Sequence, residues 1–379
     1  MPAVSVIIPT YNQAHFVAQA VESALAQTHP DVETIVVDDG STDGTPSVLA
    51  AFGDAIRTIC QENKGLPAAR NAGFRASRGE YVLFLDSDDV ILPEKLARHV
   101  ALLEAEPRFG LTYSAWQQVD AGGTRVLGQV RPNRQGHLLA DLLRRTCFFF
   151  ASAAVVRRRC LERVGLFDES LPWGEDADVW LRLARAGYPF GYLDLPLLRY
   201  RIHAGSMTAN VNPEQVRGWL AVLEKFFADP DLPRDVRALE AEAYAVLHYE
   251  TAGRYYRVGE IQMAQRHLRQ ALRTCPALDR EWFLDWVAGT ALDPRTSEPE
   301  EFIDRVFDNL IPEAVHLAPL RRRARGRYHA AAAFSASAGQ DHRKVRRHVL
   351  PALAADPSLA RDCGFLKIAT QSLMKRGKR

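Results

Sequence analysis

The sequence predicts an α/β fold in which a mainly parallel sheet, with helices on both faces, is followed by an all-helical C-terminal region. Runs rich in β-branched residues alternate with helical patterns over residues 1 to about 115. Polar clusters follow three of these runs, where the carboxyl ends of parallel strands bind ligands. From Pro213 onward the strand signal fades and helical patterning dominates. We therefore expect two domains, residues 1–210 and a helical domain over 211–379.

Four short apolar runs are the expected strands of the first domain. They are Val4–Ile8, Glu33–Val37, Ile56–Cys60 and Tyr81–Leu85. Between the first two, apolar residues recur at spacings of three and four from Phe16 to Leu25, which predicts an amphipathic helix. Strands and helices that alternate in this way form parallel sheets buried on both sides.

The pattern is mixed from residue 120 to 205. Ala121 to Gly136 is loop-like, with adjacent glycines and a proline. A short basic helix is expected over Arg157 to Val164. A second helix is expected to begin at Glu175, just after Gly174.

Composition and charge are those of an ordinary soluble globular protein, with 47% hydrophobic and 25% charged residues. The net charge of +2 gives no reason to expect a nucleic-acid partner. The cysteines are scattered and include no CxxC pair, which indicates neither a disulfide framework nor a zinc site; they are Cys60, Cys147, Cys160, Cys275 and Cys363. The chain shows no signal-peptide pattern and no long apolar segment, so we expect a cytoplasmic location.

The strongest chemical signal is Asp86-Ser87-Asp88-Asp89, directly after an apolar strand. Three carboxylates this close repel one another unless a cation or donor groups compensate. Mg²⁺ prefers oxygen ligands and commonly bridges a carboxylate to substrate phosphates. The alternative is an acidic turn that caps a helix beginning near Pro93.

Two more clusters lie at the expected carboxyl edge of the sheet. Asp39 follows the second strand, and its carboxylate could accept a hydrogen bond from a nucleotide base. An Asx turn or helix cap is the alternative there, although Asp43 could supply such a cap alone. Arg70 lies one turn into the helix after the third strand, where it could reach the nucleotide or the acidic cluster, or lie on the surface.

Two further residues are candidates for the reaction itself. Asp176 could take the proton of an acceptor hydroxyl as a general base, or it could only cap its helix. His203 ends the last strand-like segment, so it could bind a metal, although a lone histidine is usually structural.

The C-terminal region contains a weak internal repeat. The pattern His267-Leu268, Ala271-Leu272, Pro276 recurs as His348-Val349, Ala352-Leu353, Pro357 at one common offset. This suits a tetratricopeptide-like helical hairpin, with a plain helical extension as the alternative. The basic stretches Arg321–Arg327 and Lys375–Arg379 could contact anionic lipid or form a solvated face. The region could also bind a protein partner.

Four motifs, in order, resemble the family 2 inverting glycosyltransferases of the Rossmann-like GT-A fold. They are Ser5–Asn12, Val37–Ser41, Asp86–Asp89 and Gly174–Asp176. The resemblance covers about residues 1 to 205 and not the helical remainder. It implies a nucleotide-sugar donor and a divalent cation, Mg²⁺ or Mn²⁺.

The resemblance also implies roles for single residues. Pro9, Thr10 and Tyr11 would line the nucleotide site. Asp39 would bond the base, Arg70 would lie near the nucleotide, and Asp86 and Ser87 would contact the donor, Asp86 at the ribose. Asp88 would bind the metal, with His203 as a further ligand. Asp176 would be the general base, with Glu175 in a supporting role.

The function that this resemblance implies is transfer of one sugar, from a UDP-sugar in the commonest case, to a glycan, lipid-linked or other hydroxyl acceptor. No Gln-x-x-Arg-Trp motif of processive synthases follows Asp176. Such an enzyme would act in cell-surface polysaccharide or glycoconjugate synthesis, in the cytoplasm or peripherally at the inner membrane face. The alternatives are a catalytically silent glycan-binding or scaffold protein, and a sugar nucleotidyltransferase.

Overall fold

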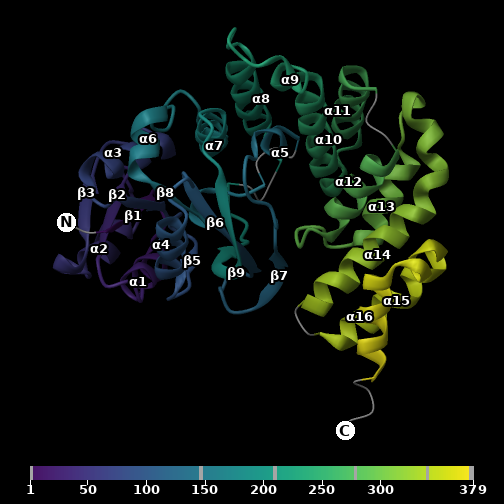
Figure 1. Cartoon of the computed structure of the whole chain (residues 1–379), viewed down its shortest axis with the longest axis horizontal. Helices are drawn as coiled ribbons and strands as arrows, with labels where there is room; N and C mark the ends of the chain where they lie inside the picture. Colours follow the sequence, from purple (N-terminus) through teal and green to yellow (C-terminus); the bar gives the residue numbers. More distant parts are fainter. Residues whose placement is uncertain (1–2, 145–147, 208–210, 277–279, 339–340, 375–379) are drawn as a thin grey trace. The chain divides into compact units, whose positions relative to one another are not determined.

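The computed structural model describes residues 3–144, 148–207, 211–276, 280–338 and 341–374 (Figure 1). The chain divides into two compact units. The first contains Met1–Ser206 and Asn212–Leu239, and the second contains Met207–Val211 and Glu240–Arg379. Cys147 and Lys375–Arg379 lie outside the described residues.

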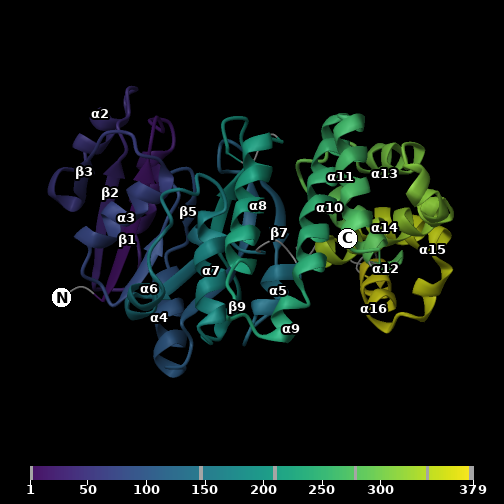
Figure 2. The same ribbon diagram turned by 90° about the horizontal axis from the view of Figure 1, so that it is seen from above.

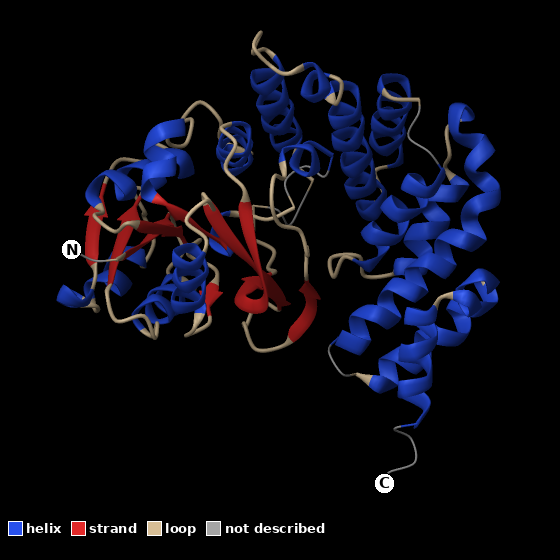
Figure 3. Cartoon of the chain, viewed as in Figure 1, coloured by secondary structure: helices blue, strands red, loops and turns tan. Residues whose placement is uncertain are grey.

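The first unit is built on a mixed sheet (Figure 3). Its strands are β1 (Val4–Thr10), β2 (Val32–Asp38), β3 (Arg57–Cys60), β4 (Tyr81–Phe84), β5 (Val90–Ile91), β6 (Leu111–Val119), β7 (Val126–Val130), β8 (Ala154–Arg157) and β9 (Phe190–Arg201). The order is β3-β2-β1-β4-β8-β6-β9-β5, and β7 pairs with β6. The strands β1 to β4 pair in parallel, as predicted, whereas β8, β7 and β5 add antiparallel pairs.

Register in the parallel part brings the polar clusters to one edge. β1 lies between β2 and β4, with Thr10 opposite Asp38 and Ile7 opposite Phe84. The chain therefore leaves all three strands at the same end of the sheet. This is the edge at which parallel α/β sheets bind ligands.

Helices cover both faces of this sheet, as predicted, with α3 and α6 on one side and α1 and α4 on the other (Figure 1). The helical elements are α1 (Val17–Leu25), α2 (Thr45–Ala50), η1 (Gly53–Ala55), α3 (Leu66–Ala76), α4 (Lys95–Ala105), α5 (Leu139–Arg144), η2 (Ala151–Ala153), α6 (Arg158–Val164), α7 (Glu175–Arg185), α8 (Pro213–Phe227) and α9 (Arg234–Arg237). α3 packs closely because Gly73 has no side chain: a Cβ there would lie 2.3 Å from Ile7 Cγ2.

One sequence-based expectation was wrong. The stretch Ala121 to Gly136 was expected to be a loop, but it contains β7, which pairs with β6. Among the described residues β7 pairs only with β6, and its residues are at most partly covered, so it lacks the apolar alternation that marks a half-buried strand.

The helices α8 and α9 belong to the first unit, whereas the predicted domain boundary lay at residue 210. Figure 2 shows α8 beside α7. Gly218 lets α8 approach Trp173, and Lys225 of α8 pairs with Asp168 and Asp178 at 2.6 and 2.9 Å. These contacts explain why residues 212–239 pack there. The domain assignment itself stays a prediction.

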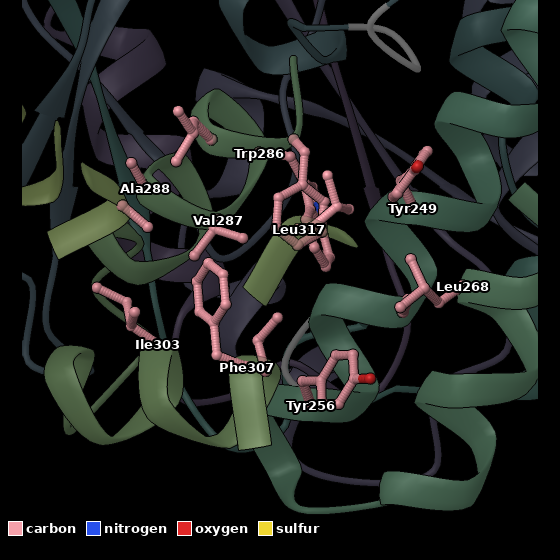
Figure 4. Packing of buried hydrophobic residues seen from close by; sticks show 14 of the residues in the cluster. Tyr249, Tyr256, Leu268, Trp286, Val287, Ala288, Ile303, Phe307 and Leu317 are labelled. Carbon is pink, nitrogen blue, oxygen red and sulfur yellow. The ribbon is translucent and has the colours of Figure 1, made fainter. Parts of the chain in front are cut away.

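The second unit is all helical around an aromatic-rich core (Figure 4). Its elements are α10 (Glu240–Val258), α11 (Ile261–Thr274), α12 (Arg280–Leu292), α13 (Pro299–Asp308), η3 (Pro312–Leu320), α14 (Arg321–Ala338), α15 (His342–Ala355), η4 (Pro357–Arg361) and α16 (Cys363–Met374). Tyr256, Leu268, Trp286 and Phe307 converge in this core.

The internal repeat corresponds to two helical hairpins, α10–α11 and α14–α15. Each hairpin contains a buried or half-buried histidine pair that joins its two helices. Nδ1 of His248 lies 3.1 Å from Nδ1 of His267, and Nδ1 of His329 lies 3.0 Å from Nδ1 of His348. The same offset of 81 residues relates the two pairs. The tetratricopeptide-like classification stays a prediction.

The basic stretch Arg321–Arg327 is largely paired within the second unit. Arg325 binds Asp304, Arg321 binds Asp308, and Arg327 binds Glu281. This pairing favours the charged-face interpretation over lipid contact. Among the described residues, no helix is both long and apolar enough to cross a membrane.

Candidate active site

The loop after β1 begins the site. Thr10 is buried at the end of the strand, and its Oγ1 has no hydrogen-bond partner among the described residues. Pro9 is buried beside it, whereas the Tyr11 side chain is 47% exposed. Asn12 has a positive φ of 52°, and its Oδ1 accepts from the Thr42 amide at 2.8 Å. This hydrogen bond connects the loop after β1 to the loop after β2.

Asp39 is buried and already has several donors. Its Oδ1 accepts from Gln61 Nε2 at 2.6 Å and from the Lys64 amide at 3.0 Å, and its Oδ2 accepts from the Gly65 amide at 2.8 Å. Asp39 therefore holds the loop that begins α3. The sequence did not reveal this structural role, and the predicted contact with a base stays a prediction.

The acidic loop lies between β4 and β5. Asp86 donates its amide to the Ser152 hydroxyl at 3.0 Å, which fixes the start of the loop. Asp88 keeps a partly exposed carboxylate, whereas Ser87 and Asp89 are buried. Burial, together with the nearby charges of Asp88 and Asp86, raises the pKa of Asp89 well above its ordinary value. The loop thus presents two partly exposed carboxylates, Asp86 and Asp88, next to the buried Asp89.

Arg70 joins the acidic loop to α7. Its Nη2 donates to Asp86 Oδ1 at 2.7 Å, and its Nη1 pairs with Glu175. Burial alone would lower the pKa of Arg70, but the two carboxylates and nearby Asp176 raise it, so the guanidinium stays charged. Arg70 is only 2% exposed, so it is not the surface arginine considered as an alternative.

Glu175 and Asp176 begin α7 because of Gly174. Gly174 has a φ of 77°, a conformation that favours glycine, and this turns the chain into the helix. Burial raises the pKa of Glu175, and Arg70 offsets part of that shift. Burial and the neighbouring Glu175 raise the pKa of Asp176 to about 7, while Arg70 opposes the shift. A carboxylate of that pKa can accept a proton near neutral pH.

The second predicted metal ligand does reach the first. His203 Nε2 lies 3.0 Å from Asp88 Oδ2, and its ring lies 4.5 Å from the Phe16 ring. Among the described residues, no group of three His, Cys, Asp or Glu side chains could hold a metal ion. The Asp88 carboxylate nevertheless fits Mg²⁺ or Mn²⁺, because such ions take much of their coordination from substrate phosphates and water. The imidazole of His203 is a less usual ligand for these ions.

Sequence reasoning missed Arg201, which holds the acidic loop in place. Its Nε donates to the Asp88 carbonyl at 2.8 Å, and its amide donates to Asp89 Oδ1 at 3.1 Å. Its Nη2 also donates to Gln19 Oε1 at 2.7 Å. Arg201 therefore fixes the backbone of Asp88, and it stands two residues before His203, the other predicted metal ligand. Its partners are mostly backbone and amide groups, which leave no charge pattern in the sequence.

Comparison with known proteins gives a consistent result. The sequence profile described as "Glycosyl transferase family 2" matches residues 5–165. The Escherichia coli protein "UDP-Glc:alpha-D-GlcNAc-diphosphoundecaprenol beta-1,3-glucosyltransferase WfaP" is 32% identical over 222 residues. That alignment covers 57% of this chain and 84% of the relative. By contrast, the chain spans 35% and 36% of the length of two matching glycosyltransferases from Rickettsia felis and Rickettsia bellii.

Two solved structures share the fold. The Staphylococcus aureus TarS 1-349 structure in complex with UDP-GlcNAc has a TM-score of 0.52 and 20% identity, covering 86% of this chain and 88% of that one. The mannosyltransferase PcManGT from Pyrobaculum calidifontis, in complex with GDP-Man and Mn²⁺, has a TM-score of 0.50 and 23% identity. That match covers 81% of this chain and 87% of that one.

Proposed function

The chain belongs to glycosyl transferase family 2 and has a GT-A-like fold, and from that membership we propose that it transfers one sugar from a UDP-sugar to a hydroxyl acceptor with inversion. The Arg70 bridge carries the proposal. It connects Asp86 of the acidic loop with Glu175, the residue before the candidate base. Groups for the donor and for the acceptor are thus parts of one hydrogen-bonded assembly.

In the proposed reaction Asp176 accepts the proton of the acceptor hydroxyl as that oxygen attacks the anomeric carbon. The bond from this carbon to the diphosphate breaks on the opposite face, so a single displacement inverts the configuration. Burial and the charge of Glu175 raise the pKa of Asp176 to about 7, and Arg70 opposes part of this shift. Asp88 and His203 would hold a divalent cation, which would offset the charge on the departing diphosphate.

The comparisons support the choice of substrates. The name of the Escherichia coli relative specifies UDP-Glc and a diphosphoundecaprenol-linked acceptor, and the TarS structure is a complex with UDP-GlcNAc. A UDP-sugar donor and a glycan or lipid-linked acceptor therefore fit this chain. Synthesis of a cell-surface polysaccharide or glycoconjugate would be its biological role. The PcManGT structure contains Mn²⁺, which supports the proposed cation.

A donor-turnover assay tests the proposal. The purified chain would be given UDP-, GDP- and dTDP-sugars with Mn²⁺, and release of the nucleoside diphosphate would be measured. We expect the parent chain to turn over at least one UDP-sugar. In the presence of acceptor, Asp176→Asn should release nucleoside diphosphate no faster than the background hydrolysis of the donor. NMR of the product should show the inverted anomer. No turnover of any donor, or retention of configuration, would overturn the proposal.

A further inference from the structure

The second unit contains a hollow of about 390 Å³ that the proposed reaction does not use. It is formed by α11, the start of α12 and η3. Its lining includes Arg269, Arg273, Arg280, Glu313, Leu272 and Leu317. Hollows of this volume accommodate small ligands or one unit of a larger one.

The charge of this hollow is unbalanced. Arg269 Nε donates to Glu313 Oε1 at 3.0 Å, so this cation is already paired. Arg273 and Arg280 are exposed, and neither has a hydrogen-bonded partner among the described residues. Among the described residues, two guanidinium groups from different helices therefore line one hollow without a hydrogen-bonded carboxylate. The charge of Arg273 does help, after the backbone amide of Glu313 and after Arg269, to lower the pKa of Glu313. Guanidinium forks match the planar, paired oxygens of phosphate and carboxylate groups.

Two of the three arginines that line the hollow have no cationic counterpart in the second hairpin. In the second hairpin, 81 residues later, Leu350 replaces Arg269 and Ala354 replaces Arg273. The buried position Ala271 is matched by Ala352, which is equally buried. The core positions thus stay apolar in both copies, whereas Arg269 and Arg273 occur only in the first copy; the position of Arg280 is matched by Arg361.

The apolar part of the lining indicates which kind of molecule bears the anionic group. Leu272 and Leu317 give the hollow an apolar side next to the arginines. A sugar ring presents C–H groups on its faces and can lie on such a surface while an attached oxyanion reaches the guanidinium groups. We propose that this hollow binds a phosphate or carboxylate group carried on a saccharide. The proposal does not depend on the donor chemistry of the first unit.

Direct binding to the full chain, without donor or metal, tests this proposal. The probes are glucose 6-phosphate for phosphate, trigalacturonate for carboxylate, and maltotriose as the neutral control, each titrated by calorimetry. The test variant is Arg273→Gln/Arg280→Gln. The matched control is Arg266→Gln, because Arg266 is an exposed arginine on α11 that does not line the hollow. All these side chains are exposed, so the melting temperatures should agree.

We expect at least one anionic probe to bind in a salt-sensitive way, and maltotriose not to bind. The double variant should weaken that binding roughly tenfold or more, as expected for the loss of charge-assisted hydrogen bonds. Arg266→Gln should leave it unchanged. Binding by glucose 6-phosphate alone would assign the site to phosphate, and binding by trigalacturonate alone would assign it to carboxylate. No binding of either anion, or equal binding by the double variant, would refute the proposal, whatever the donor assay shows.

Discussion

His203 and Asp88 are 115 residues apart in the sequence, yet the imidazole Nε2 lies 3.0 Å from the carboxylate Oδ2. The pair forms because β5, which follows the acidic loop, is hydrogen-bonded to β9, which precedes His203. Arg201, at the end of β9, then fastens the loop through the Asp88 carbonyl. The pair is therefore positioned by backbone pairing and does not rely on a flexible side chain alone.

Removal of the metal should abolish turnover if this pair holds a cation. We expect activity to vanish in EDTA and to return with Mn²⁺ or Mg²⁺. Asp88→Ala should lower kcat by about 10²–10³ or more, since it removes a group that stabilises developing charge. His203→Ala should mainly raise the Mn²⁺ concentration needed for half-maximal activity. His137→Ala, an exposed histidine, serves as the control. Full turnover in the presence of EDTA would contradict the proposed role of a metal ion.

Arg201 should affect metal binding although it is not a predicted ligand. Arg201→Met removes the hydrogen bonds to the Asp88 carbonyl and to Gln19. Groups that orient metal ligands typically contribute about 10–100-fold in metal affinity. We expect a shift of that size in the Mn²⁺ activation curve, with a smaller change in donor affinity. The exposed Arg199→Met on the same strand is the matched control. An unchanged Mn²⁺ curve would contradict the positioning role.

Asp176 should set the acid limb of the pH–rate profile. The base must be ionised, and its pKa is raised to about 7, so kcat/KM should fall tenfold per pH unit below that value. Asp176→Asn should lower the rate with acceptor by about 10²–10⁴ while leaving the donor Kd nearly unchanged. Glu175→Gln should be milder. Near-normal turnover by Asp176→Asn would leave the residue as a helix cap.

The raised pKa of Asp176 also predicts that the folded chain loses stability as the pH rises, whereas kcat/KM should increase. The folded-state pKa of Asp176 lies above the unfolded value of 3.8, so the unfolded chain gives up this proton more readily. Stability is then lost as pH rises from about 4 through about 7. Asp176→Asn cannot ionise, so we expect its melting temperature at pH 8 to equal or exceed that of the parent chain. A clear decrease at pH 8 would contradict this assignment.

Arg70 should be important for both stability and rate. Arg70→Met leaves the carboxylates of Glu175 and Asp86 without their cation, which costs about 3–5 kcal/mol when a buried pair is broken. Arg70 also lowers the pKa of Asp176, so its loss should move the acid limb of kcat/KM toward higher pH. Denaturant unfolding at pH 8 and the pH profile are the two measurements. Arg75→Met, an exposed arginine on the same helix, is the control.

The histidine pairs of the second unit predict acid sensitivity. Burial, together with the neighbouring histidine, lowers the pKa of both His267 and His348 to about 4. The unfolded chain therefore binds more protons between about pH 6.5 and 4, and stability should fall as the pH falls through this range. Hydrogen exchange should show earlier opening of α10–α11 and α14–α15. His248→Gln/His267→Gln should flatten the pH dependence in the first hairpin only.

Much of the first unit could be predicted because its signals are local. The expected strands Val4–Ile8 and Glu33–Val37 lie inside β1 and β2, whose central residues Val6–Ile8 and Ile35–Val37 are continuous buried apolar runs. The edge strand β7 could not be found, because partly exposed residues carry no apolar alternation. The helical patterning after Pro213 was also correct, since most of its helices bury one apolar side.

The candidate site was predictable as a set of residues but not as a set of contacts. The motifs drew attention to Asp86 and Asp88, because carboxylates just after a strand are unusual, and to Asp176, because it lies at the start of a helix as a candidate base. They did not reveal that Asp39 holds the Lys64 and Gly65 amides, or that Ser152 accepts from the Asp86 amide. These contacts join distant segments through backbone groups, which every residue has, so no residue type marks them.

The Arg70 bridge also constrains how this enzyme could be altered by laboratory evolution. Asp86, Arg70 and Glu175 share one buried network, so substitutions among them should be strongly non-additive. A single substitution at any of the three should lower stability or activity, even where a compensating double or triple substitution is tolerated. Libraries aimed at new donors or acceptors should therefore keep these three positions constant and vary exposed neighbours such as Tyr11. The specificity for donor or acceptor can then change while the charged network stays the same.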